Sequence, residues 1–290
     1  MTIPWIVGLA TAGLIANRAR IARETDAEYS ARYEFGADGV ALGAESFTLS
    51  GTNGIGVLLL HGSGDSPQSF RELARRLADE GYTVHAPLLP GHGRSPRAFA
   101  QTTSAEYYDS AESALTLLQS QSRGAAIVGL SMGGAIAARL AREHADVSAL
   151  VLLAPYLVPP STIRLAARFR WLWGAVTPYL GGRGESSVHD SAASLESRAY
   201  GTFSPGAVQA LVETADAGHA ALPFITQPTL VINSRQDNRI PADCALKALA
   251  SFRRPVESHW VSGCGHVITV DYCKDQVATL VVQFLRRHAS

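Results

Sequence analysis

A regular alternation of short apolar runs with helix-like segments constrains the fold of this chain more than any other feature. The apolar runs resemble strands buried on both faces and lie at residues 56–60, 82–86, 125–130, 149–153, 229–232 and 257–261. Segments with helical periodicity lie mostly between them, at 69–80, 104–121, 132–144, 242–251 and 271–287. Because parallel strands need long crossovers, usually helices, this order predicts an α/β fold with a mostly parallel central sheet and helices on both faces.

Composition fits one large domain and excludes several classes of protein. The chain has 290 residues, of which 47% are hydrophobic and 17% charged, so it can bury a sizeable core and is not disordered. Twenty-five basic residues balance 25 acidic ones, which leaves no basic excess for a nucleic-acid partner. The three cysteines, Cys244, Cys264 and Cys273, form no C-x-x-C pair and no even-numbered framework, so neither a disulfide scaffold nor a zinc ribbon is expected.

Two segments depart from the regular alternation of strand and helix. Residues 36–56 are rich in glycine and contain a short alternating run at 45–49, which suits a strand or hairpin at a sheet edge. About 70 residues separate the apolar runs that end at 153 and begin at 229, and their first part is rich in large apolar side chains. Long insertions are often functional, so we predict an α/β domain at 37–290 with a cap insertion at about 155–222. A spare helical pair packed on the sheet remains an alternative.

The amino terminus carries an apolar segment outside this pattern. The stretch from Ile3 to Ala16 has no charge and is followed by Arg18, Arg20 and Arg23. As a helix it would cover roughly 21 Å, less than the roughly 30 Å of a hydrocarbon core. Three interpretations of the 1–36 extension stay open: a short membrane anchor or interfacial helix, a helix packed on protein, and a cleaved export signal. We expect peripheral membrane contact through Ile3 to Ala16 and a cytoplasmic main domain, because the arginines follow the apolar run.

The clearest chemical signal is the sequence from Gly129 to Gly133, which reads G-x-S-x-G with Ser131 at its centre. A predicted buried strand runs into it and a predicted helix leaves it. That context indicates a nucleophile elbow, a tight turn that exposes the serine and needs small neighbours. It also places Ser131 at the amino end of a helix, where free N–H groups favour developing negative charge.

A serine hydroxyl needs a base, and the base needs a group that orients it. In this architecture the acid and the histidine follow the serine in sequence. Asp237 comes just after the predicted strand at 229–232, and His266 follows the strand at 257–261 between small residues. Asp243 is the nearest alternative acid, and a helix-capping turn residue is the structural alternative for Asp237. For His266 the alternative is an ordinary surface loop histidine.

Acyl transfer also requires hydrogen-bond donors for an oxyanion. The backbone N–H of Met132 directly follows the nucleophile, and the second donor should come from the loop after the first long strand. We predict that this second donor is the backbone N–H of Ser63. His61 and His92 are expected to be hydrogen-bonded structural histidines rather than catalytic groups.

These pieces together resemble the α/β-hydrolase superfamily, and more narrowly its bacterial carboxylesterase and monoacylglycerol lipase branch. The resemblance rests on VLLLHGSGDSPQSFRELARRLADEGYTVHAPLLPGHGRS, GLSMGG, LVINSRQDNRIP and GCGHVITVDYCKDQV, which extend in order from about Gly56 to the carboxyl terminus. It implies the α/β-hydrolase fold and a triad of Ser131, Asp237 and His266, with Ser63 as an oxyanion donor. The first 35 to 40 residues are not part of the family core, and the cap resembles no family sequence closely enough to carry over a substrate-binding residue.

The predicted function is a serine hydrolase that cleaves carboxylic esters through an acyl-enzyme intermediate. An apolar cap favours recognition of an acyl chain, so monoacylglycerols or short- and medium-chain esters are the expected small-molecule substrates. No metal or organic cofactor is implied. The alternatives are hydrolysis of a lactone, an amide or a carbon–carbon bond, or cofactor-free peroxidation, on the same scaffold. A non-catalytic hydrolase-like binding protein is the non-enzymatic alternative.

Overall fold

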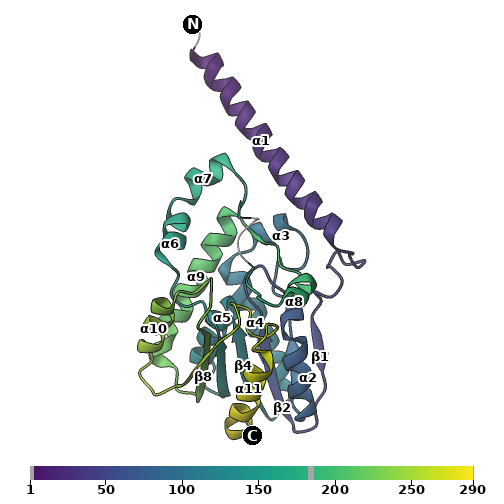
Figure 1. The fold of residues 1–290 in the computed structure, drawn as a ribbon, viewed down its shortest axis with the longest axis vertical. Helices are drawn as coiled ribbons and strands as arrows, with labels where there is room; N and C mark the ends of the chain where they lie inside the picture. Colours follow the sequence, from purple (N-terminus) through teal and green to yellow (C-terminus); the bar gives the residue numbers. More distant parts are fainter. Residues whose placement is uncertain (1–2, 182–185, 290) are drawn as a thin grey trace.

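A central sheet organises the molecule, and a computed structural model describes it over residues 3–181 and 186–289 (Figure 1). Its seven strands are β1 (Phe47–Leu49), β2 (Ile55–Leu60), β3 (Thr83–Ala86), β4 (Gly124–Leu130), β5 (Val147–Leu153), β8 (Thr229–Ser234) and β9 (Glu257–Val261). Their spatial order is β1, β3, β2, β4, β5, β8, β9. All neighbours pair in parallel except β1, which is antiparallel to β3 at the edge. The mostly parallel sheet and the edge strand are therefore confirmed.

Helices cover both faces of this sheet, so β2 is buried on both sides. Its side chains alternate: Leu58 and Leu60 belong to one hydrophobic cluster, and Val57 and Leu59 to the other. The first cluster includes residues of α4 (Ser104–Ser120), α5 (Met132–Glu143), α9 (Pro205–Ala221) and α10 (Ala242–Ala250). The second includes residues of α2 (Arg71–Asp79) and α11 (Lys274–His288). The predicted α/β layering is confirmed, since each face of the sheet packs against its own helices.

The interval 155–222, predicted as a cap, contains two kinds of element. Its smaller elements are α6 (Ser161–Arg168), α7 (Arg170–Val176), β6 (Leu180–Gly181), α8 (Ser191–Glu196) and β7 (Thr202–Phe203), and β6 pairs with β7. In contrast, α9 packs closely on α5: a Cβ at Gly218 would lie 2.5 Å from the carbonyl oxygen of Ala135. The helix α9 is therefore a crossover helix that covers the sheet, and the smaller elements of the interval precede it. The helix α3 (Pro96–Gln101) and the 3-10 turns Pro67–Phe70 and Leu222–Phe224 complete the elements.

The extension predicted at 1–36 forms one long helix, α1 (Ile3–Arg32), which projects away from the body (Figure 1). Its carboxyl end is tied to the body: Tyr29 is 3% exposed and its ring centroid lies 4.8 Å from that of Tyr200. The hydroxyl of Tyr33 donates to the carbonyl of Ser197 at 3.0 Å. Within residues 3–181 and 186–289, no helix combines the length and apolar character needed to cross a membrane.

Candidate active site

The turn between β4 and α5 holds Ser131 in a backbone conformation that only close packing can maintain. Its φ is 55° and its ψ is −118°, a region that residues other than glycine rarely adopt. The N–H of Ser131 donates to Leu153 and its carbonyl accepts from Tyr156, both at 2.9 Å. A Cβ at Gly133 would lie 2.0 Å from the carbonyl oxygen of Leu60, so only glycine fits beside the turn. The local structure is the predicted strand–turn–helix elbow.

Ser131, His266 and Asp237 lie in one hydrogen-bonded chain, although they are far apart in sequence. Nε2 of His266 lies 2.8 Å from Oγ of Ser131, and Nδ1 lies 2.8 Å from Oδ2 of Asp237. The Asp237 carboxylate accepts, so Nδ1 carries the proton and Nε2 is left to accept from the serine hydroxyl. Ser131 is 8% and His266 6% exposed, so the chain is shielded from bulk water. The geometry can draw the proton from Ser131 toward the imidazole as the hydroxyl attacks an electrophile.

The carboxylate of Asp237 is held on both sides. Its Oδ1 accepts from the backbone N–H groups of Arg239 and Ile240, each at 2.8 Å. Burial alone would raise its pKa, but the His266 charge, the His266 hydrogen bond and these two N–H donors outweigh burial and lower the pKa. Asp237 is therefore ionised at neutral pH. The alternative acid, Asp243, is exposed and pairs instead with Lys247 at 2.8 Å.

The two predicted oxyanion donors lie in the loops around Ser131. A Cβ at Gly62 would lie 3.2 Å from Cβ of Ser131, so the loop that carries Ser63 runs directly beside the nucleophile. Met132 is the first residue of α5. In the part of the chain that the structure describes, the backbone N–H groups of Ser63 and Met132 have no hydrogen-bond partner. Both remain available to bind an anionic oxygen.

Two buried histidines fix the loop that carries Ser63. His61 accepts from the N–H of Leu89 and His92 accepts from the N–H of Gly64, both at 3.0 Å. Burial lowers the pKa of His61 well below its ordinary value and the pKa of His92 to about 4, so both rings are neutral acceptors at pH 7. They join the loops after β2 and β3, which is the structural role predicted for them.

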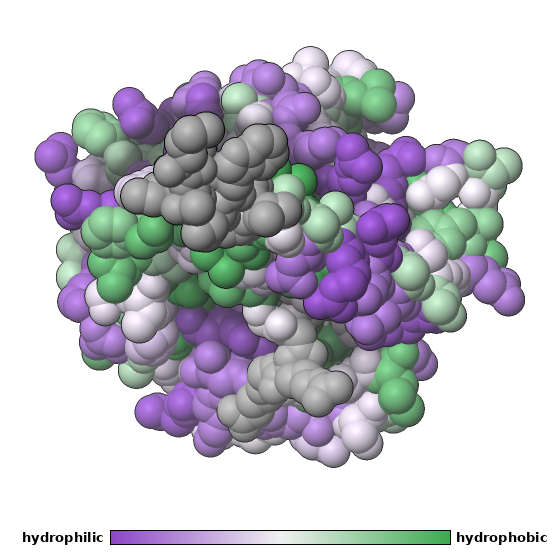
Figure 2. All heavy atoms as spheres, turned by 90° about the horizontal axis from the view of Figure 1, so that it is seen from above, coloured by the Kyte–Doolittle hydropathy of each residue, from purple (hydrophilic) through white to green (hydrophobic). Residues whose placement is uncertain are grey.

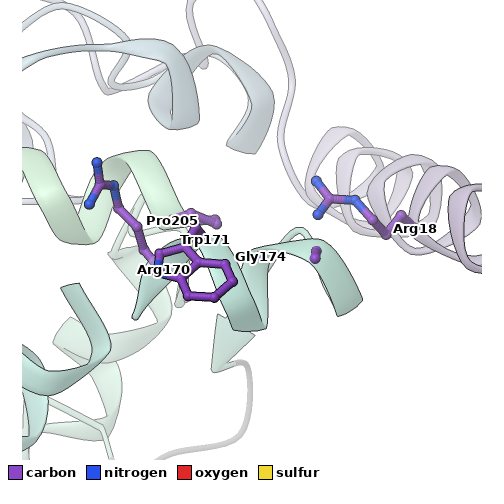
Figure 3. A pocket seen from close by; sticks show the side chains of 6 residues that line it. Arg18, Arg170, Trp171, Gly174 and Pro205 are labelled. Carbon is purple, nitrogen blue, oxygen red and sulfur yellow. The ribbon is translucent and has the colours of Figure 1, made fainter. Parts of the chain in front are cut away.

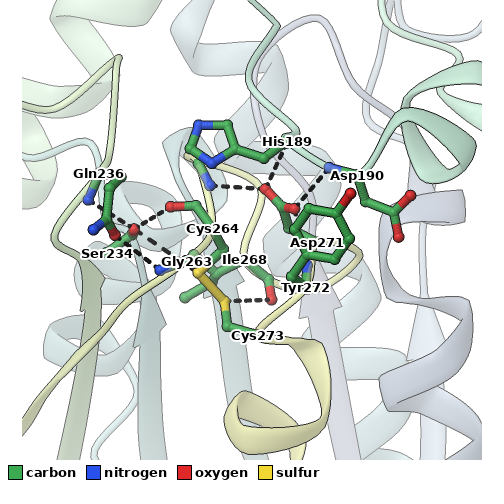
Figure 4. Close-up of a disulfide and its surroundings, with 11 residues drawn as sticks. His189, Asp190, Ser234, Gln236, Gly263, Cys264, Ile268, Asp271, Tyr272 and Cys273 are labelled. Atoms are coloured by element: carbon green, nitrogen blue, oxygen red, sulfur yellow. Dashed lines mark hydrogen bonds between the residues drawn. A yellow bond between two sulfur atoms is a disulfide. The ribbon is translucent and has the colours of Figure 1, made fainter.

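Three groups near the site were missed by the sequence prediction. Cys264 and Cys273 form a disulfide that closes the loop containing His266 (Figure 4). The only signal in the sequence was that two of the three cysteines flank this loop. Asp271, in the same loop, is completely buried. Asp65 lies in the loop after β2; burial raises its pKa to about 6, and its Oδ2 is buried without a hydrogen-bond partner.

The functional groups of the site are a hydroxyl, an imidazole and a carboxylate, which do not form the ligand set of a metal centre. Among the residues that the structure describes, no group of three or more histidine, cysteine, aspartate and glutamate side chains is placed to hold a metal ion. The arrangement matches an acyl-transfer site built from side chains and backbone N–H groups.

Comparison with known proteins agrees with this geometry. The family described as "Alpha/beta hydrolase family" matches residues 57–280. A thermostable monoacylglycerol lipase of Bacillus sp. (strain H-257) is 29% identical over 254 residues, covering 86% of this chain and 97% of the relative. A carboxylesterase of Bacillus subtilis (strain 168) is 26% identical over 239 residues, covering 80% and 92%. A solved structure from work on the metagenome-derived lipolytic enzymes LipS and LipT has a TM-score of 0.78 at 28% identity, covering 86% of this chain and all of its own. The chain therefore belongs to the alpha/beta hydrolase family.

Proposed function

We propose that this protein is a carboxylic ester hydrolase that works through an acyl-enzyme on Ser131. The observation that carries the proposal is the hydrogen-bonded chain Ser131–His266–Asp237, with both contacts at 2.8 Å. In the first half-reaction, Oγ of Ser131 attacks the ester carbonyl while its proton moves to Nε2 of His266. The imidazolium, stabilised by Asp237, then protonates the departing alcohol as the carbon–oxygen bond breaks.

The second half-reaction repeats these steps with water. His266 takes a proton from a water molecule that attacks the acyl carbonyl, and returns it to Oγ of Ser131 as the carboxylic acid leaves. In each half, the tetrahedral intermediate carries its negative charge on the former carbonyl oxygen. The backbone N–H groups of Ser63 and Met132 are the proposed donors to that oxygen, and each is worth about 3 to 4 kcal/mol of transition-state stabilisation.

Monoacylglycerols and short- or medium-chain acyl esters are the proposed substrates. The names of the two Bacillus relatives support this class. The elements α6, α7 and α8 are the proposed cap, since they precede α9 and do not belong to the sheet layers. Several large apolar side chains of α6, α7 and the residue between them are exposed, namely Leu165, Phe169, Trp171, Leu172 and Val176. Such a surface suits contact with acyl chains better than contact with polar substrates.

An acyl-chain-length series of glycerol and nitrophenyl esters tests the proposal. We expect turnover of these esters, and we expect Ser131→Ala to lower kcat by about 10³-fold or more and to abolish labelling by a fluorophosphonate probe. Negligible ester turnover beside cleavage of a lactone, an amide or a carbon–carbon bond would favour one of those reactions. If the wild-type protein is not labelled by the probe and cleaves none of these substrates, the binding-protein alternative holds.

We also propose that the protein contacts membranes peripherally through the amino-terminal segment from Ile3 to Ala16. The exposed side chains of α1 include Leu14 and Ile15. The helices α6 and α7 lie at the end of the body beside α1 (Figure 1). A cavity of about 400 Å³ between α1 and α7 is lined by Arg18, Arg170 and Trp171, among others (Figure 3). Viewed from this end, apolar residues lie at the surface among hydrophilic ones (Figure 2). Arginine and tryptophan are residues that favour the lipid headgroup region.

Two observations bear on the compartment of the main domain. The arginines that follow the apolar segment favour the cytoplasmic side of a membrane, which is our proposal. The Cys264–Cys273 disulfide is of a kind that persists mainly in oxidising compartments. The number of free thiols distinguishes the two compartments, provided that cells are quenched in acid and the thiols are alkylated after denaturation, because all three cysteines are buried. One alkylated thiol, that of Cys244, supports an oxidising compartment, and three support the cytoplasm.

A further inference from the structure

Asp271 accepts hydrogen bonds from four backbone N–H groups in two segments of the chain, its own loop and residues 189–190. Its Oδ2 accepts from Gly265 at 2.7 Å and from His189 at 2.8 Å. Its Oδ1 accepts from Tyr272 at 2.8 Å and from Asp190 at 2.9 Å. Burial alone would raise the pKa of Asp271, but the four donors outweigh it and lower the pKa. The side chain is therefore a buried carboxylate whose hydrogen-bonding capacity is used to connect backbone segments.

One of these segments, residues 186–190, crosses both loops that carry the candidate catalytic side chains, and we call it the strap. The carbonyl of Ser187 accepts from the N–H of His266 at 2.8 Å and from that of Val267 at 3.1 Å. On the other side, Asn238 donates to the carbonyl of Ser186 and Arg239 donates to Oγ of Ser187, both at 2.7 Å. The strap is thus bound to the residue next to Asp237 and to His266 itself.

The backbone next to His266 packs directly against the backbone of the strap. A Cβ at Gly265 would lie 2.6 Å from the carbonyl oxygen of Ser187, so the two backbones are in direct contact. Asp271 joins the N–H of Gly265 to the N–H groups of the strap, and the Cys264–Cys273 disulfide closes the loop that contains both Asp271 and His266 (Figure 4). Since His266 is held through its neighbours, its imidazole position depends on these connections.

We propose that Asp271 is a positioning residue for His266: its carboxylate ties the histidine loop to the strap and so holds the imidazole between Ser131 and Asp237. This inference rests on the proposed function, because it assigns a way of orienting the same base. Asparagine has one accepting oxygen and a donating NH2 group, so Asp271→Asn would oppose two of the four N–H groups with another donor. The imidazole would then lose its alignment, and small misplacements of reacting groups are costly.

The test measures kcat per reactive serine, with the serine counted by fluorophosphonate titration. For Asp271→Asn we expect kcat per titrated serine to fall at least about tenfold while KM stays within about twofold. A purely structural role would lower the number of titratable sites and leave the rate per site unchanged. Asp275→Asn is the matched control, because Asp275 lies on α11 with an exposed side chain that pairs with Arg76 rather than with the strap.

A second pair of variants tests the strap without touching the carboxylate. Asp190 has a φ of −69°, which proline can adopt, so Asp190→Pro removes the N–H that donates to Asp271. Asp190→Ala keeps that N–H and removes only the side chain that caps α8. We expect the proline variant to lower kcat per serine by severalfold relative to the alanine variant.

A wild-type value of kcat per serine in Asp271→Asn would overturn the positioning role. If Asp271→Asn does not fold, equal rates in the two Asp190 variants would overturn it. Either result would leave the proposed ester hydrolysis intact, since that is tested by Ser131→Ala.

Discussion

Ser131 combines a strained backbone with a side chain that lies within hydrogen-bond distance of an imidazole. A left-handed conformation at a residue other than glycine costs on the order of 1–3 kcal/mol and persists only where the surroundings hold it. Here the bonds to Leu153 and Tyr156 and the close passage of Gly133 beneath Leu60 hold it. This backbone conformation directs the side chain out of the helix and toward His266. A nucleophile needs such an exposed position beside its base.

Asp65 is the residue whose ionisation is expected to weaken the fold most visibly. Its pKa is about 6 in the folded protein against 3.8 for an ordinary aspartate, with burial as the main cause. Below pH 3.8 the carboxyl is protonated in both folded and unfolded chains and costs nothing. Between pH 3.8 and about 6 only the unfolded chain releases the proton, so stability falls, and above 6 the full penalty of about 1 to 3 kcal/mol applies.

Replacing Asp65 by asparagine removes this penalty. We expect Asp65→Asn to be more stable than the wild type by roughly 1–2 kcal/mol at pH 8, and the difference to disappear by pH 4. Urea unfolding across that pH range measures it. Asp109→Asn, the same change at an exposed position of α4, should shift stability by no more than about 0.5 kcal/mol at either pH. A difference between Asp65→Asn and wild type that does not vary with pH would contradict the assigned cause.

Among the elements, the contact between α5 and α9 places part of the long interval after β5 in the helical layer that covers the sheet. The small residues Ala135 and Gly218 let the two helices meet backbone to backbone. This contact explains why an interval with the length of a cap also supplies a helix of the sheet layer. The smaller elements of the interval precede α9, and residues 186–190 contact the loops that carry Asp237 and His266.

Adding a methyl group at this crossing should therefore be costly. In Gly218→Ala the new Cβ would lie 2.5 Å from the carbonyl oxygen of Ala135, so the helices must separate. We expect a net loss of about 1–3 kcal/mol in the free energy of unfolding, despite the higher helix propensity of alanine. Gly13→Ala is the control: its Cβ would meet nothing within 4 Å, so its urea midpoint should not fall. Equal midpoints for the two variants would show that the helices separate without cost.

At the scale of the whole molecule, α1 has two parts with different roles. Its carboxyl end belongs to the body through Tyr29 and Tyr33, and its amino end projects from it (Figure 1). A deletion meant to remove only the projecting part must therefore keep these tyrosines. The chain that begins at Ile21 satisfies this condition, whereas a chain that begins at Gly36 would also lose part of the core.

Deleting residues 1–20 separates membrane contact from catalysis. We expect kcat on a water-soluble nitrophenyl ester to stay within about twofold, because the site lies at the ends of β4, β8 and β9. Sedimentation with vesicles of phosphatidylcholine and phosphatidylglycerol should fall severalfold, since the apolar residues and two of the arginines are removed. Equal sedimentation of the full chain and the shortened chain would reject contact through this segment.

The sequence by itself determined the sheet, its covering helices and the positions of Ser131, Asp237 and His266 after strands, because apolar periodicity and the G-x-S-x-G turn are local patterns. Only the tertiary structure decided which side chains meet around them. Asp271 binds residues 81 and 82 positions away, and α9 joins the core through a contact with α5 that no local pattern encodes. The disulfide spans just nine positions, yet it too depends on how the loop around His266 folds back. Pairings of this kind depend on which backbone segments lie side by side in the folded chain. The apolar periodicity of one segment does not determine which other segment it will contact.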